Sequence, residues 1–154
     1  MYHFISNSEE DTMNFAKNLA SYLKKGDVIV LSGELGCGKT KFTEGILKYF
    51  GLEEEISSPT FTIVNEYHKG ENNIYHFDVY RLSDVEEFYA VGGEEYFTNG
   101  ICILEWGEIV EEALPKDYLK LEFFKDKEND NKRIINIITF GERFNLLNFE
   151  MILN

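Results

Sequence analysis

The chain has 154 residues, of which 44% are hydrophobic, 28% are charged and two are prolines. This composition excludes a disordered or collagen-like chain, and the length suits a single domain over residues 1–154. The net charge of −13 argues against direct binding to nucleic-acid phosphates or anionic membranes. The first residues lack a positive segment followed by a long apolar stretch, and no later run approaches membrane-spanning length, so we expect a cytoplasmic protein.

The first third of the chain alternates helical and strand-like patterns. Ser8 and Asp11 suit a capping box, and apolar residues then recur at helical spacing until Gly26. Residues 28–31 are a continuous apolar run, which is typical of a strand covered on both faces in a parallel sheet. Residues 41–50 place their apolar side chains on one stripe and predict a second helix.

The rest of the chain is richer in strand patterns. These lie at residues 61–67, 74–80, 101–104, 119–124 and 134–140. A polar turn separates the first two, which predicts an antiparallel hairpin. Ser83 with Glu86 offers a capping box for a short helix as far as Ala90, and residues 142–153 suit one small amphipathic helix.

The turn after the first predicted strand carries a complete phosphate-loop motif. Its residues are Gly33, Glu34, Leu35, Gly36, Cys37, Gly38, Lys39 and Thr40, which match G-x-x-x-x-G-K-[ST] between a strand and a helix. Glycine permits the backbone turns that aim successive N–H groups at a phosphate. Lys39 would give a positive charge to the β- and γ-phosphates, and Thr40 a hydroxyl ligand for Mg²⁺. The motif predicts nucleotide binding and a three-layer α/β fold similar to P-loop NTPases, with a mostly parallel central sheet and the hairpin as an antiparallel addition.

Two acids and a threonine are candidates for completing this site. Hydrolysis needs a carboxylate for the metal's water shell and a group that orients the nucleophile. Asp78 shares one face of a predicted strand with His76, and Glu105 follows an apolar strand, where open sheets place ligand-binding groups. Thr60 follows the second helix, where nucleotide switches hold a threonine that senses the γ-phosphate. The alternatives are solvated strand ends for the acids and a plain turn for Thr60.

Four further side chains have two interpretations each. Cys37 is either a thiol activated by a helix N-terminus or a small tolerated side chain. Arg81 either neutralises phosphate charge or pairs with Asp78. Trp106 either packs in the core or is a platform for a ligand or a partner interface, and His76 is either a hydrogen-bonded structural histidine or part of the site.

Taken in order, these motifs resemble one family. The 33–40 motif, the Ser-Pro-Thr-Phe sequence at 58–61, the His-Phe-Asp-Val-Tyr-Arg sequence at 76–81 and the pair Glu105-Trp106 resemble the bacterial TsaE (YjeE) family of tRNA threonylcarbamoyladenosine biosynthesis proteins. The resemblance implies a small P-loop ATPase that acts with TsaD and TsaB, hydrolyses ATP to ADP and phosphate when docked to them, and resets that complex between cycles. It implies contact with tRNA only through these partners.

The resemblance also implies roles for individual residues. Lys39 would hold phosphates, Thr60 would make the switch contact, and the whole 33–40 loop with Trp106 would surround the nucleotide. Mg²⁺ would be held by Thr40 with Asp78 and Glu105, and the two acids would share the metal-shell and water-orienting duties. The acidity of the chain fits a protein that meets tRNA only through partners, because such a protein needs no basic groove.

Two other functions fit the phosphate loop by itself. A small metabolite kinase would need an arginine-bearing lid to exclude water, whereas the basic residues here are scattered. A guanine-nucleotide switch would carry an Asn-Lys-x-Asp pattern, which the sequence lacks, so ATP is preferred over GTP. Product analysis would separate these classes: free phosphate indicates a hydrolase, a phosphorylated metabolite indicates a kinase, and GTP binding without turnover indicates a switch.

Overall fold

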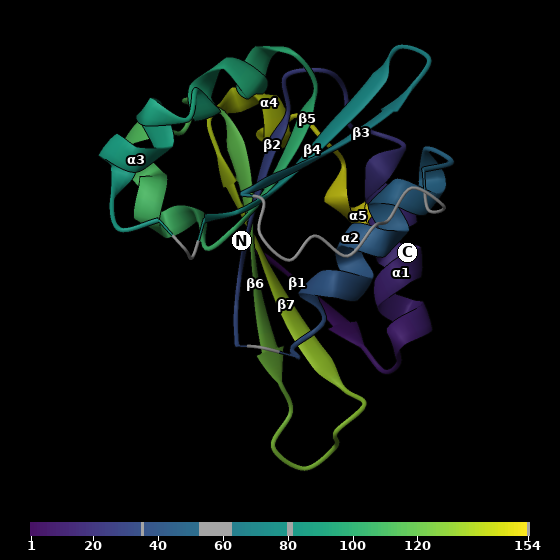
Figure 1. Cartoon of the computed structure of the whole chain (residues 1–154). Coiled ribbons are helices and arrows are strands. Elements are labelled where there is room, and N and C mark those ends of the chain that lie inside the picture. Colours follow the sequence, from purple (N-terminus) through teal and green to yellow (C-terminus); the bar gives the residue numbers. More distant parts are fainter. Residues whose placement is uncertain (35, 53–62, 80–81, 154) are drawn as a thin grey trace.

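A seven-stranded mixed sheet runs through the computed structural model of the protein, which describes residues 1–34, 36–52, 63–79 and 82–153 (Figure 1). Its strands are β1 (Tyr2–Ser6), β2 (Val28–Ser32), β3 (Val64–Lys69), β4 (Asn72–Asp78), β5 (Ile101–Glu105), β6 (Tyr118–Lys125) and β7 (Arg133–Phe140). The α-helices are α1 (Glu9–Ala20), α2 (Lys39–Tyr49), α3 (Val85–Ala90), α4 (Glu142–Asn145) and α5 (Phe149–Ile152), and the 3-10 helices are η3 (Gly93–Thr98) and η4 (Gly107–Ala113).

The centre of the sheet is parallel and both of its edges are antiparallel. The strand order is β1-β7-β6-β2-β5-β4-β3, and β6, β2, β5 and β4 pair in parallel. The apolar runs of β2 and β5 are buried on both faces, as expected for central parallel strands. The predicted hairpin forms the β3–β4 edge, although residues 61, 62 and 80 lie outside the described part. The opposite edge, β6-β7-β1, is also antiparallel, which the sequence analysis did not predict.

Helices cover both faces of this sheet, so the α/β architecture has three layers (Figure 1). One core lies between the sheet and α1, α2, α4 and α5, and the other lies between the sheet and α3, η3 and η4. Strand β2 shows why both faces are covered: Ile29 and Leu31 belong to the first core, and Val28 and Val30 to the second. Neighbouring side chains of a strand point to opposite faces, so a run without polar residues needs cover on each side.

The beginning of the chain corrects two predictions. Residues 2–6 form the edge strand β1, which was not predicted, because its place in the sheet depends on pairing with the distant β7. The predicted cap of α1 is confirmed, since the Ser8 hydroxyl accepts the Asp11 N–H at 3.0 Å. However, α1 ends at Ala20 and does not continue to Gly26. Two N–H groups there bond three residues back, Tyr22 to Leu19 and Leu23 to Ala20, so the last turn tightens and the helix stops.

Two later helices also differ from their predictions. The cap of α3 is Asp84, whose side chain accepts the Glu87 N–H, and not Ser83 with Glu86. Residues 142–153 form the two short helices α4 and α5 in place of one. The side chain of Asn148 accepts the N–H of Met151 and starts α5 anew. Asparagine favours such caps over helix interiors, because its side chain competes for backbone hydrogen bonds.

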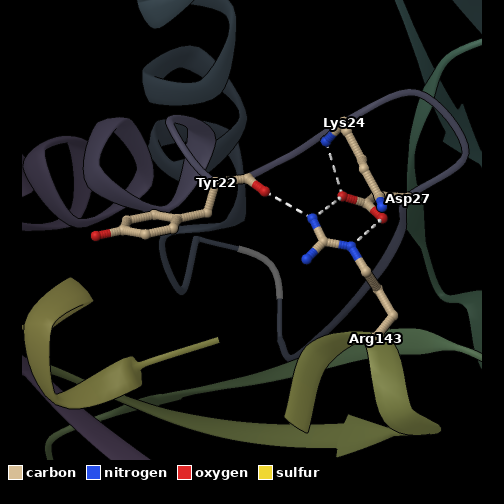
Figure 2. Close-up of polar contacts among 4 residues, drawn as sticks. All are labelled: Tyr22, Lys24, Asp27 and Arg143. Atoms are coloured by element: carbon tan, nitrogen blue, oxygen red, sulfur yellow. Dashed lines mark hydrogen bonds and ion pairs between the residues drawn. The ribbon is translucent and has the colours of Figure 1, made fainter. Parts of the chain in front are cut away.

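A buried ion pair fastens the C-terminal part of the chain to the loop before β2 (Figure 2). Asp27 is only 3% exposed, and its carboxylate accepts hydrogen bonds from Nε and Nη2 of Arg143 at 3.2 and 3.0 Å. The same carboxylate accepts the Lys24 N–H, and Arg143 also donates to the Tyr22 carbonyl oxygen at 2.7 Å. These contacts satisfy the buried charge and hold α4 in place.

Within the described ranges, the structure contains no helix that is both long enough and apolar enough to traverse a lipid bilayer.

Candidate functional site

The 33–40 loop, described except for residue 35, joins the end of β2 to the start of α2. Gly38 adopts a left-handed conformation with φ of +111° at the helix cap, where L side chains are strained. Gly33 has φ of +138°, and a Cβ atom there would lie 2.6 Å from the Phe123 carbonyl oxygen. No side chain caps α2, so its first N–H groups stay available to an anion.

Lys39 is held over this loop by two contacts. Its side chain is almost fully covered, with the residue 6% exposed. The ammonium group donates a hydrogen bond to the Gly33 carbonyl oxygen at 2.8 Å and lies 4.4 Å from the centre of the Trp106 ring. A cation over an indole face at this distance is attracted by the ring. The loop therefore has its positive charge in place.

Asp78 and Glu105 lie side by side at the ends of two neighbouring strands. They are register partners in the parallel pair β4–β5, and Glu105 is also the partner of Leu31 near the end of β2. Register partners point to the same face of a sheet. The carboxyl ends of β2, β4 and β5 therefore bring both acids to the edge where the 33–40 loop begins, as ligand-binding groups in open α/β sheets are arranged.

The side chain of His76 on β4 contacts the Glu105 carboxylate. The imidazole Nε2 lies 2.8 Å from Glu105 Oε2, and the two side chains are only 18% and 17% exposed. Burial by itself would raise the pKa of Glu105. The hydrogen bond and positive charge of His76, together with the charge of Lys39, outweigh that effect and lower the pKa below its usual 4.5. Glu105 is therefore a carboxylate at neutral pH.

A cavity of about 400 Å³ lies between the loop and these strand ends. The predicted residues that line it are Gly36, Gly38, Lys39, Thr40, Asp78, Glu105 and Trp106. Trp106 follows β5 directly and is, among the described residues other than glycine, the only one with positive φ (+65°). The structure thus brings phosphate-loop residues and both acids to one cavity, although three separate segments supply them.

The other predicted residues have different places. Leu35 and Thr60 lie outside the described residues, as does Arg81. Glu34 is exposed, and its carbonyl oxygen accepts the Cys37 N–H at 3.2 Å. Cys37 is buried in the first core, and this burial raises the pKa of its thiol. The geometry therefore favours the small packed side chain over the activated thiol at this position.

The sequence analysis missed two parts of the cavity wall. One is the start of α1, with Ser8, Glu9 and Thr12, and the other is the β6–β7 turn, with Asp130, Asn131 and Arg133. Arg133 donates to the Gly36 carbonyl oxygen at 3.2 Å across 97 residues of sequence. The residues between β6 and β7 are charged or polar, but only the pairing of β6 with β2 places them beside the loop.

The donor atoms of this cavity fit a hard cation such as Mg²⁺. Thr40, Asp78 and Glu105 offer hydroxyl and carboxylate oxygens, which Mg²⁺ prefers. In the described part of the chain, no group of three or more His, Cys, Asp and Glu residues is arranged to hold a metal. A Mg²⁺ ion held by these three side chains would take its remaining ligands from phosphates and water.

Comparison with known proteins identifies the family. The family model described as "Threonylcarbamoyl adenosine biosynthesis protein TsaE" matches residues 6–135. The chain belongs to the TsaE family. The resemblance seen in the sequence motifs is thereby confirmed, and the protein is one of a family involved in tRNA threonylcarbamoyladenosine biosynthesis.

Relatives in the TsaE family are similar over most of their length. The chain is 40% identical over 139 residues to "tRNA threonylcarbamoyladenosine biosynthesis protein TsaE" of Bacillus subtilis, covering 90% of this chain and 85% of the relative. It is 38% identical over 146 residues to the protein of the same name from Rickettsia felis, covering 94% and 84%. The crystal structure of Bacillus subtilis YdiB superposes with a TM-score of 0.77 at 33% identity, covering 98% of this chain and 93% of that one.

Proposed function

We propose that this TsaE-family protein is a Mg²⁺-dependent ATPase with a P-loop NTPase-like fold, which hydrolyses ATP to ADP and phosphate when docked to TsaD and TsaB. The observation that carries the proposal is the single cavity in which the Lys39 side of the 33–40 loop faces Asp78 and Glu105. Metal-assisted phosphoryl transfer needs a positively charged site that binds the phosphates and carboxylates that hold the metal. The two sides of the cavity offer these two features.

The loop side of the cavity would bind the phosphates. The N–H groups at the start of α2 would point at the phosphate oxygens, and Lys39 would turn from the Gly33 carbonyl oxygen to the β- and γ-phosphates. The Gly33 contact and the Trp106 ring keep the ammonium group near the loop before the nucleotide arrives. The lysine therefore needs little reorganisation, which favours binding.

The strand side of the cavity would act on the γ-phosphate. Thr40 with Asp78 and Glu105 would hold Mg²⁺ and its water shell, and a bound Mg²⁺ would neutralise charge on the phosphates. One of the two acids would ligate the ion and the other would orient the attacking water. Thr60 remains in the proposal as the switch contact, and Trp106 as the aromatic side chain beside the nucleotide.

The partners and location in this proposal follow from the family and the charge. Hydrolysis would reset the TsaD–TsaB complex between cycles of threonylcarbamoyl transfer, and the chain would meet tRNA only through these partners. The net charge of −13 supports the indirect contact, since a chain with this charge is repelled by tRNA phosphates. The cytoplasm, where tRNA is modified, is the proposed location.

Phosphate release from ATP tests this proposal. The purified protein is assayed with Mg²⁺, alone and with the matching TsaD and TsaB, and Lys39→Ala serves as the blank. Stimulation by the partners that disappears in Lys39→Ala is the expected result. Absence of turnover in an intact complex with bound nucleotide would contradict the ATPase proposal and favour a binding switch, whereas a phosphorylated metabolite would favour a kinase.

A further inference from the structure

We propose that His76 is a positioning residue, which holds one oxygen of the Glu105 carboxylate so that the other oxygen stays directed at the cavity. The inference rests on the proposed ATPase site, because Glu105 receives its role there. It adds a residue from a different strand, whose side chain acts on the site only through Glu105.

The strand register places His76 next to Glu105 on the sheet. His76 is the partner of Ile103 in the β4–β5 pair, and Asp78 is the partner of Glu105 two residues further along. His76 therefore lies diagonal to Glu105 on the same face of the sheet. Its Nε2 atom is 2.8 Å from Glu105 Oε2, a distance that suits a charge-assisted hydrogen bond.

His76 does not line the cavity itself. Glu105 lines the cavity, but His76 is not among the described residues that form its wall. Both side chains are more than four-fifths covered, so neither rotates freely in solvent. With Oε2 fixed by the imidazole, the carboxylate plane is fixed as well, and Oε1 remains for water or a cation. Partners behind a metal-binding carboxylate typically set its orientation in this way.

The other two histidines of the chain lie at exposed positions and contact no residue of the cavity wall in the described structure. His3 and His68 each bond to an asparagine side-chain oxygen at 2.6 Å, and His68 Nε2 also lies 3.5 Å from Oε1 of the exposed Glu66. His68 lies on β3 of the same hairpin as His76 and is 53% exposed, so it provides a matched control. Substitution of His68 removes an imidazole from the same region without affecting Glu105.

Enzyme kinetics test the positioning role. His76→Leu and His76→Gln are compared with His68→Leu in the complex with TsaD and TsaB. We expect His76→Leu to lower kcat by about 10- to 100-fold, the usual effect of removing such a partner, while the KM for ATP changes little. His76→Gln keeps an N–H donor for Glu105 and should recover most of kcat. Unchanged kcat in a folded His76→Leu, or no recovery in His76→Gln, would overturn the inference.

A double-mutant comparison distinguishes positioning from a general structural effect. In a Glu105→Gln background, His76→Leu should cause no further loss of kcat, since its only route to the reaction has been removed. A further loss equal to that seen in the wild-type background would overturn the inference. Thermal unfolding of each variant shows whether a loss reflects unfolding.

A binding measurement keeps the test independent of turnover. The affinity for a non-hydrolysable ATP analogue is measured across a range of Mg²⁺ concentrations. With Glu105 as the acid that ligates the ion, His76→Leu should need about 10-fold more Mg²⁺ for the same affinity, with affinity in the absence of Mg²⁺ unchanged. The same Mg²⁺ dependence as the wild type would overturn the role of His76. A wild type that binds the analogue but never hydrolyses ATP would contradict the ATPase proposal, and the Mg²⁺ dependence would still decide on His76.

Discussion

The two sides of the cavity are built in different ways. The loop side consists of consecutive residues whose own backbone shapes it, with Gly33, Gly38 and Lys39 within one turn between β2 and α2. The strand side consists of Asp78, Glu105 and His76, which meet only because β4 and β5 pair in a particular register. A motif search finds the first kind of side directly, whereas the second kind becomes visible only when strands are aligned.

Substitutions on the two sides of the cavity should therefore have different effects. In the proposed function, a change in the loop side would remove a group that contacts the phosphates, so both binding and turnover would suffer. A change in the strand side would leave the phosphate contacts intact and would affect the reaction of the bound nucleotide. Variants of the two sides should therefore separate in kinetics, and variants far from both should affect stability only.

The largest expected effect is on the loop side. Lys39→Ala should lower kcat/KM for ATP by about 1,000-fold, because it removes the positive charge aimed at the phosphates. The fold should remain intact, since the ammonium group makes one hydrogen bond, to the Gly33 carbonyl oxygen, and one cation–π contact, to the Trp106 ring. Steady-state phosphate release measures the effect. Lys48→Ala, at an exposed position of the same helix, is the control, and wild-type turnover by Lys39→Ala would refute the site.

A smaller effect is expected on the strand side. Glu105→Gln and Asp78→Asn should each lower kcat by about 100-fold, while nucleotide affinity at saturating Mg²⁺ stays close to that of the wild type. The amides keep the shape of the side chains but lose the negative charge. Isothermal titration with ADP and single-turnover hydrolysis measure the two quantities, with the exposed Glu111→Gln as control. Loss of binding with normal turnover of the bound fraction would contradict the proposed roles.

Away from both sides, the Asp27–Arg143 pair should matter for stability alone. Arg143→Leu leaves the buried Asp27 carboxylate with the Lys24 N–H but without its cation, which should cost about 2 kcal/mol in the free energy of unfolding. The value is below that of a fully buried pair, because the Arg143 side chain is 20% exposed. Urea unfolding measures it. A fall in kcat at temperatures where the variant is folded would show that this region and the site are coupled.

The smallest effect concerns the pH dependence of stability. The pKa of Glu105 is lower in the folded protein than its usual 4.5, so folding favours the ionised carboxylate. This contribution is complete above pH 4.5 and is lost as the pH falls through the folded value. The difference in unfolding free energy between the wild type and Glu105→Gln should therefore shrink below pH 4.5. An increase of that difference at acid pH would contradict the direction of the shift.

The fold was predictable where the pattern is local and strong. The apolar runs of β2 and β5, the β3–β4 hairpin and the Ser8 cap follow from spacing and side-chain chemistry over a few residues. The sequence analysis failed at two places for different reasons. It missed strand β1, which is held by pairing with the distant β7, and it overlooked the local cap at Asn148 that separates α4 from α5.

The candidate site was predictable in its residues but not in its contacts. Lys39, Asp78 and Glu105 were candidates from motif and strand position, and the structure brings them to one cavity. Nothing local indicates that Arg133 reaches the Gly36 carbonyl oxygen, since 97 residues separate the two. The choice between the two interpretations of Cys37 also needed the fold, because burial decides its pKa.

The sequence by itself determined the class of protein, the phosphate-loop motif and the acids that could face it, because glycine spacing and apolar runs act over a few residues. Only the tertiary structure decided which face each strand presents, that His76 binds Glu105 and that the β6–β7 turn closes on the loop. These contacts depend on strand order and register. Register is selected by how the whole set of side chains packs on both faces of the sheet, and no short segment carries that information.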